Sequence, residues 1–517
     1  MELNESSAEA PLKASLGDPA RAGARRRTWL ALALGAAAFA LVLGVTSGRG
    51  PGLDPDAMAY LGAATSFAQH GTLRVPSSQW DSEDSTSALT TWPPAFSIAM
   101  AAPRAVGVSP LSSARIVNAI AAFITAAVLF LLLEGAAGTI AAICGVIGVF
   151  ATTAIVGVHL SVLSEPLFLA SLVLTLWAMV SAQRPFVAGI PAAIAAMLRY
   201  AGVCAPAAIA IWFFFTGRKS LRQRFTDAAK AATIPAIVMA IWLLRSVRVG
   251  DSSGAPEFAL HGNFGVTFRE TTRTFADWLA PGIDPPTLQL IVALTLAAGV
   301  VAIVVRGARH RSPHARTIMR ADALLLGCYL LVLMSARVLV GSAIPFDFRL
   351  LAPAILLAEI RIIIAIAGYL AHAGTATRRI VVAACTLWFA ASATQSFRDA
   401  SDAVTDGYDF ASTDWESSPT LDWVRSGSHG WTLFSNWPAA IYFKTSRMAR
   451  DTPQSLDTAD LREFAEILER RHGAFVAFSA DNPDYPSGEA LARKLGLNKL
   501  AQFDDGAIWV APTGISK

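Results

Sequence analysis

An acid and a phenol stand four residues apart near the start of the chain, at Asp56 and Tyr60. They follow the first long apolar run, in a segment that holds several further carboxylates. A charged carboxylate beside hydrocarbon is costly to maintain and implies a functional reason for its presence. The sequence therefore predicts that this segment, residues 48–110, carries the chemistry of the protein. The alternative is that Asp56 only caps the helix that follows it.

The composition determines what kind of protein must position these side chains. Of 517 residues, 54% are hydrophobic and 15% are charged, and the mean hydropathy is +0.48. A soluble core cannot use so many apolar residues. Because a bilayer is crossed by roughly 17–25 apolar residues, the sequence predicts an all-α polytopic membrane bundle of about eleven spans. The expected spans are 29–47, 111–133, 137–156, 162–182, 186–201, 203–216, 228–246, 287–305, 321–340, 350–371 and 380–397.

The lysines and arginines predict how the bundle is oriented. The run Arg25-Arg26-Arg27 precedes the first span, and basic loops at 218–224, 306–320 and 378–379 fall on the same side of an alternating bundle. Short basic loops stay in the cytoplasm. We therefore expect a multi-pass protein of the inner (plasma) membrane, with its N-terminus inside and the segment 48–110 outside. The net charge of +4 reflects this topology, and no nucleic-acid partner is implied.

Three parts of the chain are expected to behave differently. Residues 1–28 are predicted to be a disordered cytoplasmic leader, residues 29–397 a membrane domain, and residues 398–517 a small extracytoplasmic α/β domain. The last part should contain strands at 431–436, 474–479 and 507–511 and helices at 460–471 and 488–495.

The exported segment is expected to begin with a helix that lies in the membrane interface. From Asp56 onward, Met58 and Leu61 fall on one face, which we expect to lie against lipid. Gly71 is expected to end this helix.

Five short motifs occur in a fixed order, beginning with the exported acid. They are Asp56-x-x-x-Tyr60, Trp92-Pro93-Pro94, Ser164-Glu165-Pro166-Leu167-Phe168, Leu198-Arg199-Tyr200 and Phe348-Arg349-Leu350-Leu351-Ala352-Pro353. Together they resemble the GT-C superfamily of membrane glycosyltransferases, in particular the protein O-mannosyltransferases and the lipid A aminoarabinose transferases. That family often has two adjacent acids at the start of its loop. Here the second acid is Asp54, across Pro55, which leaves its role open.

The resemblance implies an inverting transfer of a sugar from a polyprenyl-phosphate donor to a protein, lipid or polysaccharide acceptor at the outer face. Asp56 is then the expected catalytic base, with a pKa raised by partial desolvation, and Asp54 the second catalytic acid. Arg199 and Arg349 are expected to bind the donor phosphate, because planar guanidinium groups suit phosphate oxygens. Lysine at either position should weaken donor binding with little effect on folding. The remaining expected substrate-binding residues are Tyr60, His159, Glu165 and Tyr200.

Plainer interpretations stay open for several of these residues. Each arginine alone is also explained by snorkelling to lipid headgroups, and Glu165 by a structural ion pair inside the bundle. A divalent metal ion at Asp56, His159 and Glu165 is a weaker hypothesis, because the sequence has no convincing metal-ligand spacing.

Two other classes of protein fit the same composition. A multi-pass transporter or flippase also has many spans and intramembrane charges, and a non-enzymatic envelope assembly protein could use the C-terminal domain for binding. A cavity open to both lipid and the outer face, lined by Asp56, Glu165 and Arg199, would favour the enzyme.

Overall fold

The computed structural model describes residues 19–512 except 77–78, 85, 182–183, 217–219, 250–263, 308–311, 340–345, 428–429 and 483–484. The helices of the membrane part are α1 (Pro19–Val45), α2 (Pro55–His70), α3 (Ala95–Ala105), α4 (Pro110–Ala137), α5 (Thr139–Val149), α6 (Thr153–His159), α7 (Glu165–Ser181), α8 (Pro185–Leu198), the short 3-10 helix η1 (Tyr200–Val203), α9 (Cys204–Phe215), α10 (Leu221–Val249), α11 (Phe264–Leu279), α12 (Pro286–Gly307), α13 (Pro313–Leu339), α14 (Phe348–Leu370) and α15 (Thr375–Thr405). The C-terminal helices are α16 (Thr413–Glu416), α17 (Pro419–Gly427), α18 (Pro438–Thr445), α19 (Thr458–Arg470) and α20 (Gly488–Leu495). The strands are β1 (Arg74–Val75), β2 (Ser87–Ala88), β3 (Thr432–Ser435), β4 (Gly473–Phe478), β5 (Asn498–Phe503) and β6 (Gly506–Val510).

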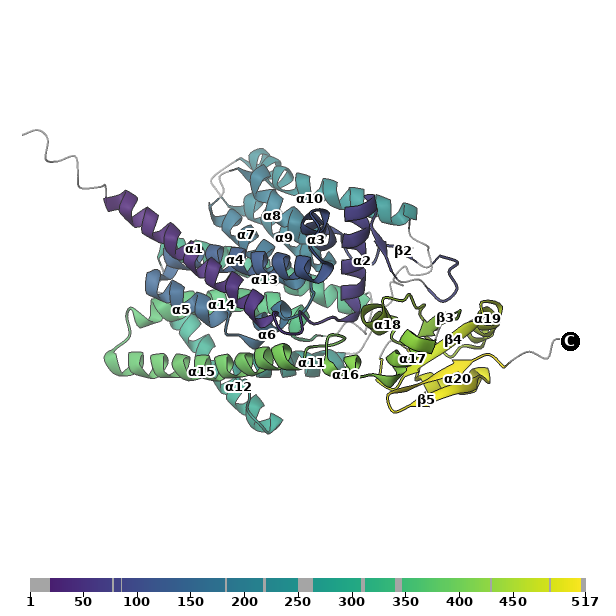
Figure 1. Ribbon diagram of the computed structural model, residues 1–517. Coiled ribbons are helices and arrows are strands. Elements are labelled where there is room, and N and C mark those ends of the chain that lie inside the picture. Colours follow the sequence, from purple (N-terminus) through teal and green to yellow (C-terminus); the bar gives the residue numbers. More distant parts are fainter. Residues whose placement is uncertain are drawn as a thin grey trace, which may run out of the picture.

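The helices form one bundle, with α4 and α14 among its most buried members (Figure 1). Ser109 caps α4 by accepting a hydrogen bond from the backbone N–H of Ser112, and Pro110 occupies the first turn. The buried positions of α4 are rich in alanine and leucine. Small side chains let helix backbones approach closely inside a membrane, and α4 packs against α1, α5 and α7.

The expected membrane character is confirmed. Within the described part of the chain, seven helices are long and apolar enough to cross a membrane, and the bent pair α5 and α6 makes an eighth. Three further apolar helices, α7, α8 and α9, are shorter. Each of the eleven expected spans therefore coincides with a helix or a bent helix pair, and the number that cross the bilayer stays a prediction.

One span is broken where the sequence predicts a continuous one. Helices α5 and α6 meet at an angle of 61°. The carbonyl of Ala151 at the break accepts hydrogen bonds from Ser392 Oγ (2.9 Å) and Ser396 Oγ (2.7 Å), and Thr152 Oγ1 donates to Glu359 Oε1 (2.6 Å). Non-helical backbone at membrane depth requires such partners. The break is thus stabilised by polar side chains of α14 and α15.

Three expectations about local structure are wrong. Helix α1 begins at Pro19, so the predicted leader 1–28 is helical over its last part, while residues 1–18 lie outside the described residues. Helix α15 continues to Thr405, so the membrane helix does not end at residue 397. Met58 and Leu61 of α2 are buried by protein rather than facing lipid, because α3, α4, β1 and α18 pack around this helix.

The C-terminal part forms the expected α/β unit, located at one end of the bundle (Figure 1). Its sheet has the order β3-β4-β6-β5, with β3 parallel to β4 and the other pairs antiparallel. Strand β4 is buried along its whole length and has helix α19 packed against it. The sequence pattern did not predict the edge strand β5, whose side chains are largely exposed and give no apolar alternation.

The segment that follows α2 is fastened to this C-terminal unit. Trp80 packs edge-on against Phe464 of α19, with ring centroids 5.7 Å apart. Arg471 donates through Nη1 to the carbonyl of Ser82 (2.7 Å) and pairs through Nη2 with Glu83 Oε1 (2.8 Å). The acidic segment after α2 is therefore held by groups nearly four hundred residues later in the chain.

We expect Arg471→Ala to lower the unfolding temperature of the protein and Arg470→Ala to leave it unchanged. Only 12% of the Arg471 side chain is exposed, whereas Arg470 is 65% exposed and lies 3.9 Å from Glu83. Removing Arg471 leaves the carbonyl of Ser82 without one of its donors, a loss of about 1–3 kcal/mol. Thermal unfolding of the two variants in detergent checks this, and equal unfolding temperatures would contradict the assigned contact.

The orientation of the bundle is open to a direct labelling test. We expect a cysteine at Ser455 to react with a membrane-impermeant maleimide in intact cells, and a cysteine at Ser220 to react only after lysis. The background should lack the four native cysteines. Part of the basic loops that motivate this orientation, residues 217–219 and 308–311, lies outside the described residues. The opposite labelling pattern would place the acidic segment in the cytoplasm.

Candidate active site

Three carboxylates and two guanidinium groups from distant parts of the chain meet at one point, which we call the ion cluster. Its members are Asp54, Asp56, Glu165, Arg199 and Arg349. Arg349 contacts all three acids, through Nη1 to Asp54 Oδ2 (2.8 Å), Nη2 to Asp56 Oδ2 (2.8 Å) and Nε to Glu165 Oε1 (3.2 Å). Arg199 Nη1 lies 2.6 Å from the same Glu165 oxygen. The two arginines thus share one carboxylate oxygen.

The first two acids are positioned by the start of α2. Asp54 is the N-cap, and its Oδ1 accepts a hydrogen bond from the backbone N–H of Ala57 (3.0 Å). Pro55 fits the first helical position because it has no N–H to leave unsatisfied, and Gly71 ends the helix at a φ of 67°. The capping role that the sequence offered as an alternative for Asp56 therefore belongs to Asp54. Asp56 lies in the first turn.

A short bridge between two loops brings Glu165 to these acids. The backbone N–H of Gly52 donates to the carbonyl of Leu160 (2.8 Å), and that of Val162 donates to the carbonyl of Gly52 (2.9 Å). A Cβ at position 52 would lie 2.5 Å from Ser161 Oγ and 3.0 Å from Tyr408 Cβ, so any larger residue would push these side chains away. Glu165 follows immediately as the first residue of α7 and is 1% exposed.

Both arginines stand at helix ends. Arg199 has extended backbone between α8 and η1, and this break turns its side chain toward Glu165. Arg349 is the second residue of α14, whose N-cap Asp347 accepts from the backbone N–H of Leu350 (3.1 Å). An isolated buried charge would be expensive, but each guanidinium here has a carboxylate within hydrogen-bond reach.

The two aspartates differ in how accessible their carboxylate oxygens are to a substrate. Asp54 is buried, and its Oδ2 forms the ion pair with Arg349 without hydrogen-bond geometry. Burial raises the pKa of the Asp54 carboxyl well above its usual range, and the charge of Asp56 raises it further, while Arg349 lowers it. The Asp56 side chain is 26% exposed, and its Oδ1 has no partner among the residues that the structure describes. Asp56 is therefore the more accessible proton acceptor.

Ser164 and Tyr60 extend the cluster inward. Ser164 Oγ lies 3.3 Å from Arg199 Nη1 and 3.3 Å from the hydroxyl of Tyr60. The ring of Tyr60 is fully buried and packs edge-on against Trp92 and Phe96, at centroid distances of 5.9 and 5.1 Å. The spacing from Asp56 to Tyr60 is thus explained by packing of one helical turn, and the hydroxyl of Tyr60 reaches the cluster through Ser164.

Two other predicted site residues lie apart from the ion cluster. The hydroxyl of Tyr200 donates to the carbonyl of Thr90 (3.0 Å) and accepts from Trp242 Nε1 (3.1 Å), which ties α10 to the segment before α3. His159 is buried and donates through Nδ1 to the carbonyl of Ile155 (2.7 Å). None of the described contacts of either residue reaches an ion-cluster side chain.

Asp409 is a neighbour of the cluster that the sequence did not reveal. The backbone N–H of Phe410 donates to the carbonyl of Leu53 (3.1 Å), which holds Asp409 next to Asp54. Asp409 adopts a φ of 52°, and its charge acts on Asp54. It follows α15, more than three hundred residues from Asp54 along the chain, and no local pattern indicates this contact.

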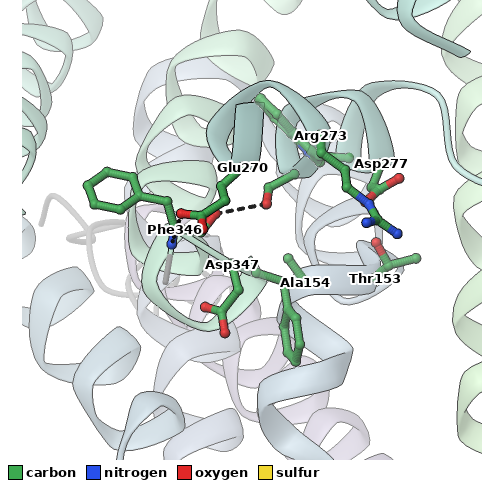
Figure 2. A pocket seen from close by; sticks show the side chains of 10 residues that line it. Thr153, Ala154, Glu270, Arg273, Asp277, Phe346 and Asp347 are labelled. Carbon is green, nitrogen blue, oxygen red and sulfur yellow. Dashed lines mark hydrogen bonds between the residues drawn. The ribbon is translucent and has the colours of Figure 1, made fainter. Parts of the chain in front are cut away.

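A cavity lies beside the ion cluster and not within it. It is lined by the N-terminal end of α6, by α11 and by residues 346–348, with a volume of about 290 Å³ (Figure 2). Asp56, Glu165 and Arg199 are not among its lining residues. Among the described residues, no three His, Cys, Asp or Glu side chains are arranged to hold a metal ion. Arg349 supplies the positive charge between the three carboxylates.

Comparison with solved structures reveals the same architecture in three membrane enzymes. ArnT from Cupriavidus metallidurans, bound to undecaprenyl phosphate, is 13% identical, with a TM-score of 0.58 over 94% of this chain and 98% of ArnT. The mycobacterial arabinofuranosyltransferase AftD is 16% identical, with a TM-score of 0.58 over 95% of this chain and 40% of AftD. The oligosaccharyltransferase AglB from Archaeoglobus fulgidus, in complex with an inhibitory peptide and a dolichol-phosphate, is 12% identical, with a TM-score of 0.50 over 87% of this chain and 69% of AglB.

Neither a family model nor a curated protein matches the sequence. The likeness extends over nearly the whole chain, including the C-terminal unit. The resemblance predicted from the five motifs is therefore confirmed at the level of structure: the chain has the GT-C fold of membrane glycosyltransferases.

Proposed function

We propose that the protein is an inverting glycosyltransferase that moves a sugar from a polyprenyl-phosphate donor to an envelope acceptor at the outer face of the inner membrane. The observation that carries the proposal is the ion cluster, in which the accessible carboxylate of Asp56 pairs with Arg349, and Arg349 shares Glu165 with a second guanidinium, that of Arg199. The structure of ArnT with undecaprenyl phosphate supports a polyprenyl-phosphate ligand for this fold.

The reaction needs a base and a cation more than it needs an acid. Asp56 accepts the proton of the acceptor hydroxyl as its oxygen attacks the anomeric carbon. The bond between that carbon and the phosphate oxygen breaks, and the electron pair leaves with the polyprenyl phosphate. A phosphate is a stable leaving group once its charge is met by preorganised cations. Attack from the face opposite the phosphate inverts the anomeric configuration.

The two arginines have different roles in this mechanism. Arg349 uses three of its nitrogens on Asp54, Asp56 and Glu165 and so fixes the carboxylates. Arg199 uses only Nη1, toward Glu165 and Ser164, and its other N–H groups have no partner among the described residues. Arg199 is therefore the better placed to bind the phosphate, and Arg349 to position the base.

The position of the charges argues against the transporter alternative. Glu165 begins α7, Arg199 follows α8 and Arg349 lies in the first turn of α14, so the cluster is at helix ends and not at the middle of the bundle. Transporters place their binding charges near the bilayer midplane. An assembly protein would have no need of an accessible base beside paired arginines.

The test is release of polyprenyl phosphate. Purified protein in lipid nanodiscs is incubated with a panel of polyprenyl-phosphate sugars and an envelope lipid or peptide acceptor, with the Asp56→Asn protein as control. We expect release with at least one donor by the native protein only. Movement of the donor across a proteoliposome membrane without any release would instead identify a flippase.

A further inference from the structure

The cavity beside the ion cluster has walls that are already held in place. Glu270 Oε2 on α11 accepts from the backbone N–H of Phe346 (3.2 Å), and Thr274 Oγ1 donates to the carbonyl of Phe346 (3.0 Å). Glu270 also pairs with Arg337 Nη2 (3.4 Å). Helix α11 is thus tied to the segment before α14, and the space between them is preformed, as is usual for sites of small ligands.

Several polar groups at this cavity have hydrogen-bonding atoms without a partner among the described residues. The guanidinium of Arg273 forms no hydrogen bond or ion pair with the part of the chain that the structure describes. Asp277 accepts from Gln289 Nε2 (2.8 Å) with Oδ1, and Asp347 caps α14 with Oδ1, which leaves one carboxylate oxygen on each. Figure 2 shows Arg273 and Asp277 beside Thr153, with Asp347 across the cavity.

This combination selects one kind of ligand. A simple anion would be repelled by Glu270, Asp277 and Asp347, and a simple cation would leave the guanidinium of Arg273 without an acceptor. Hydroxyl groups can both donate to carboxylates and accept from a guanidinium. Phe346 and Trp278 add apolar surface to the same walls, against which the C–H face of a ring can pack.

The cavity is coupled to the ion cluster through the residues that begin α14. Asp347 and Phe348 line it, and Arg349 is the next residue along the chain. Burial raises the pKa of Asp347, whereas the charge of Arg349 lowers it, so the two sites share one electrostatic environment. The wall of the cavity formed by residues 346–348 therefore leads directly into the arginine that holds Asp56.

We propose that this cavity is a subsite for a hydroxyl-bearing sugar ring, in which Arg273 and Asp277 determine which sugar is accepted. The proposal rests on the proposed function for the source of the ring, which is either the transferred sugar of the donor or a sugar of the acceptor. Binding of a sugar does not depend on transfer activity, so binding and transfer are tested in separate assays.

The experiment measures saturation transfer by NMR from the purified full chain to a panel of free monosaccharides. We expect at least one sugar to bind, and the Arg273→Gln/Asp277→Asn protein to bind it about tenfold or more weakly, since each lost charged hydrogen bond is worth a factor of that order. Arg269→Gln, on the same helix and also exposed, is the matched control and should bind as the native protein does. Thr153→Phe, which fills the cavity from α6, should abolish binding although no residue of α11 is changed.

The results separate this proposal from the proposed function. No saturation transfer to any sugar, or equal binding by the native and pocket variants, would overturn the subsite even if transfer activity is present. Sugar binding that depends on Arg273 and Asp277 supports the subsite even if no transfer is found. In a working transfer assay, the Arg273→Gln/Asp277→Asn protein is compared with the native protein. If its KM for the donor is raised, the ring is the transferred sugar. If its KM for the acceptor is raised, the ring belongs to the acceptor. An unchanged KM for both would also overturn the subsite.

Discussion

Replacing Asp56 by Asn is expected to lower the rate of sugar transfer roughly 10²–10⁴-fold, the usual contribution of a positioned general base. Asn keeps the size of the side chain and one oxygen toward Arg349 Nη2, but it cannot take the proton of the acceptor hydroxyl. The side chain is 26% exposed, so the loss of its charge should be tolerated by the fold. Initial rates of polyprenyl phosphate release measure the effect, with polyprenyl phosphate binding and thermal unfolding as controls.

Asp54→Asn is the informative partner of this variant. Asn is also a good N-cap, so the hydrogen bond to the backbone N–H of Ala57 can be kept. Since Asp54 is buried and caps α2, we expect a smaller loss of rate than for Asp56→Asn. An inactive Asp54→Asn protein beside an active Asp56→Asn protein would exchange the roles of the two acids. Full activity of both would remove this segment from the chemistry.

Arg349→Gln is expected to destabilise the protein by about 3–5 kcal/mol, because it leaves buried carboxylates without their main counter-charge. Glu165 retains Arg199, but Asp54 and Asp56 have no other described ion pair. From the sequence, lysine at this position is expected to have little effect on folding. The three ion pairs of Arg349 predict a loss of stability instead. Arg349→Lys keeps the charge but cannot reach three carboxylates at once, so it should also lower the unfolding temperature.

Arg199→Lys is the matched variant for the other guanidinium. Glu165 then still has Arg349 at 3.2 Å, so we expect a nearly unchanged unfolding temperature. Binding of polyprenyl phosphate should weaken about tenfold or more, since a fork of N–H donors to the phosphate is lost. Thermal unfolding and lipid-phosphate binding of both variants separate the roles. Similar losses of stability for Arg199→Lys and Arg349→Gln would contradict the division of work between the arginines.

The membrane bundle and its site could be predicted from sequence to different degrees. Long apolar stretches are a strong signal, because hydrocarbon requires every backbone group to be bonded within the helix. The bend between α5 and α6 gave no such signal, since the groups that stabilise it, Ser392, Ser396 and Glu359, lie on other helices. Likewise, the apolar face of α2 predicts burial but not whether lipid or protein provides it, and here protein does.

The sequence by itself identified the charged residues of the site: Asp54, Asp56, Glu165, Arg199 and Arg349 were selected because an unpaired charge beside an apolar run is costly, and because the motifs around them resemble those of the GT-C superfamily. Only the tertiary structure decided how they are paired. It assigned the helix cap to Asp54, left one oxygen of Asp56 accessible, and moved His159 and Tyr200 away from the cluster. Which ends of helices meet depends on packing between segments hundreds of residues apart, such as Gly52 against Leu160 and Leu53 against Phe410, and no local pattern of residues encodes those contacts.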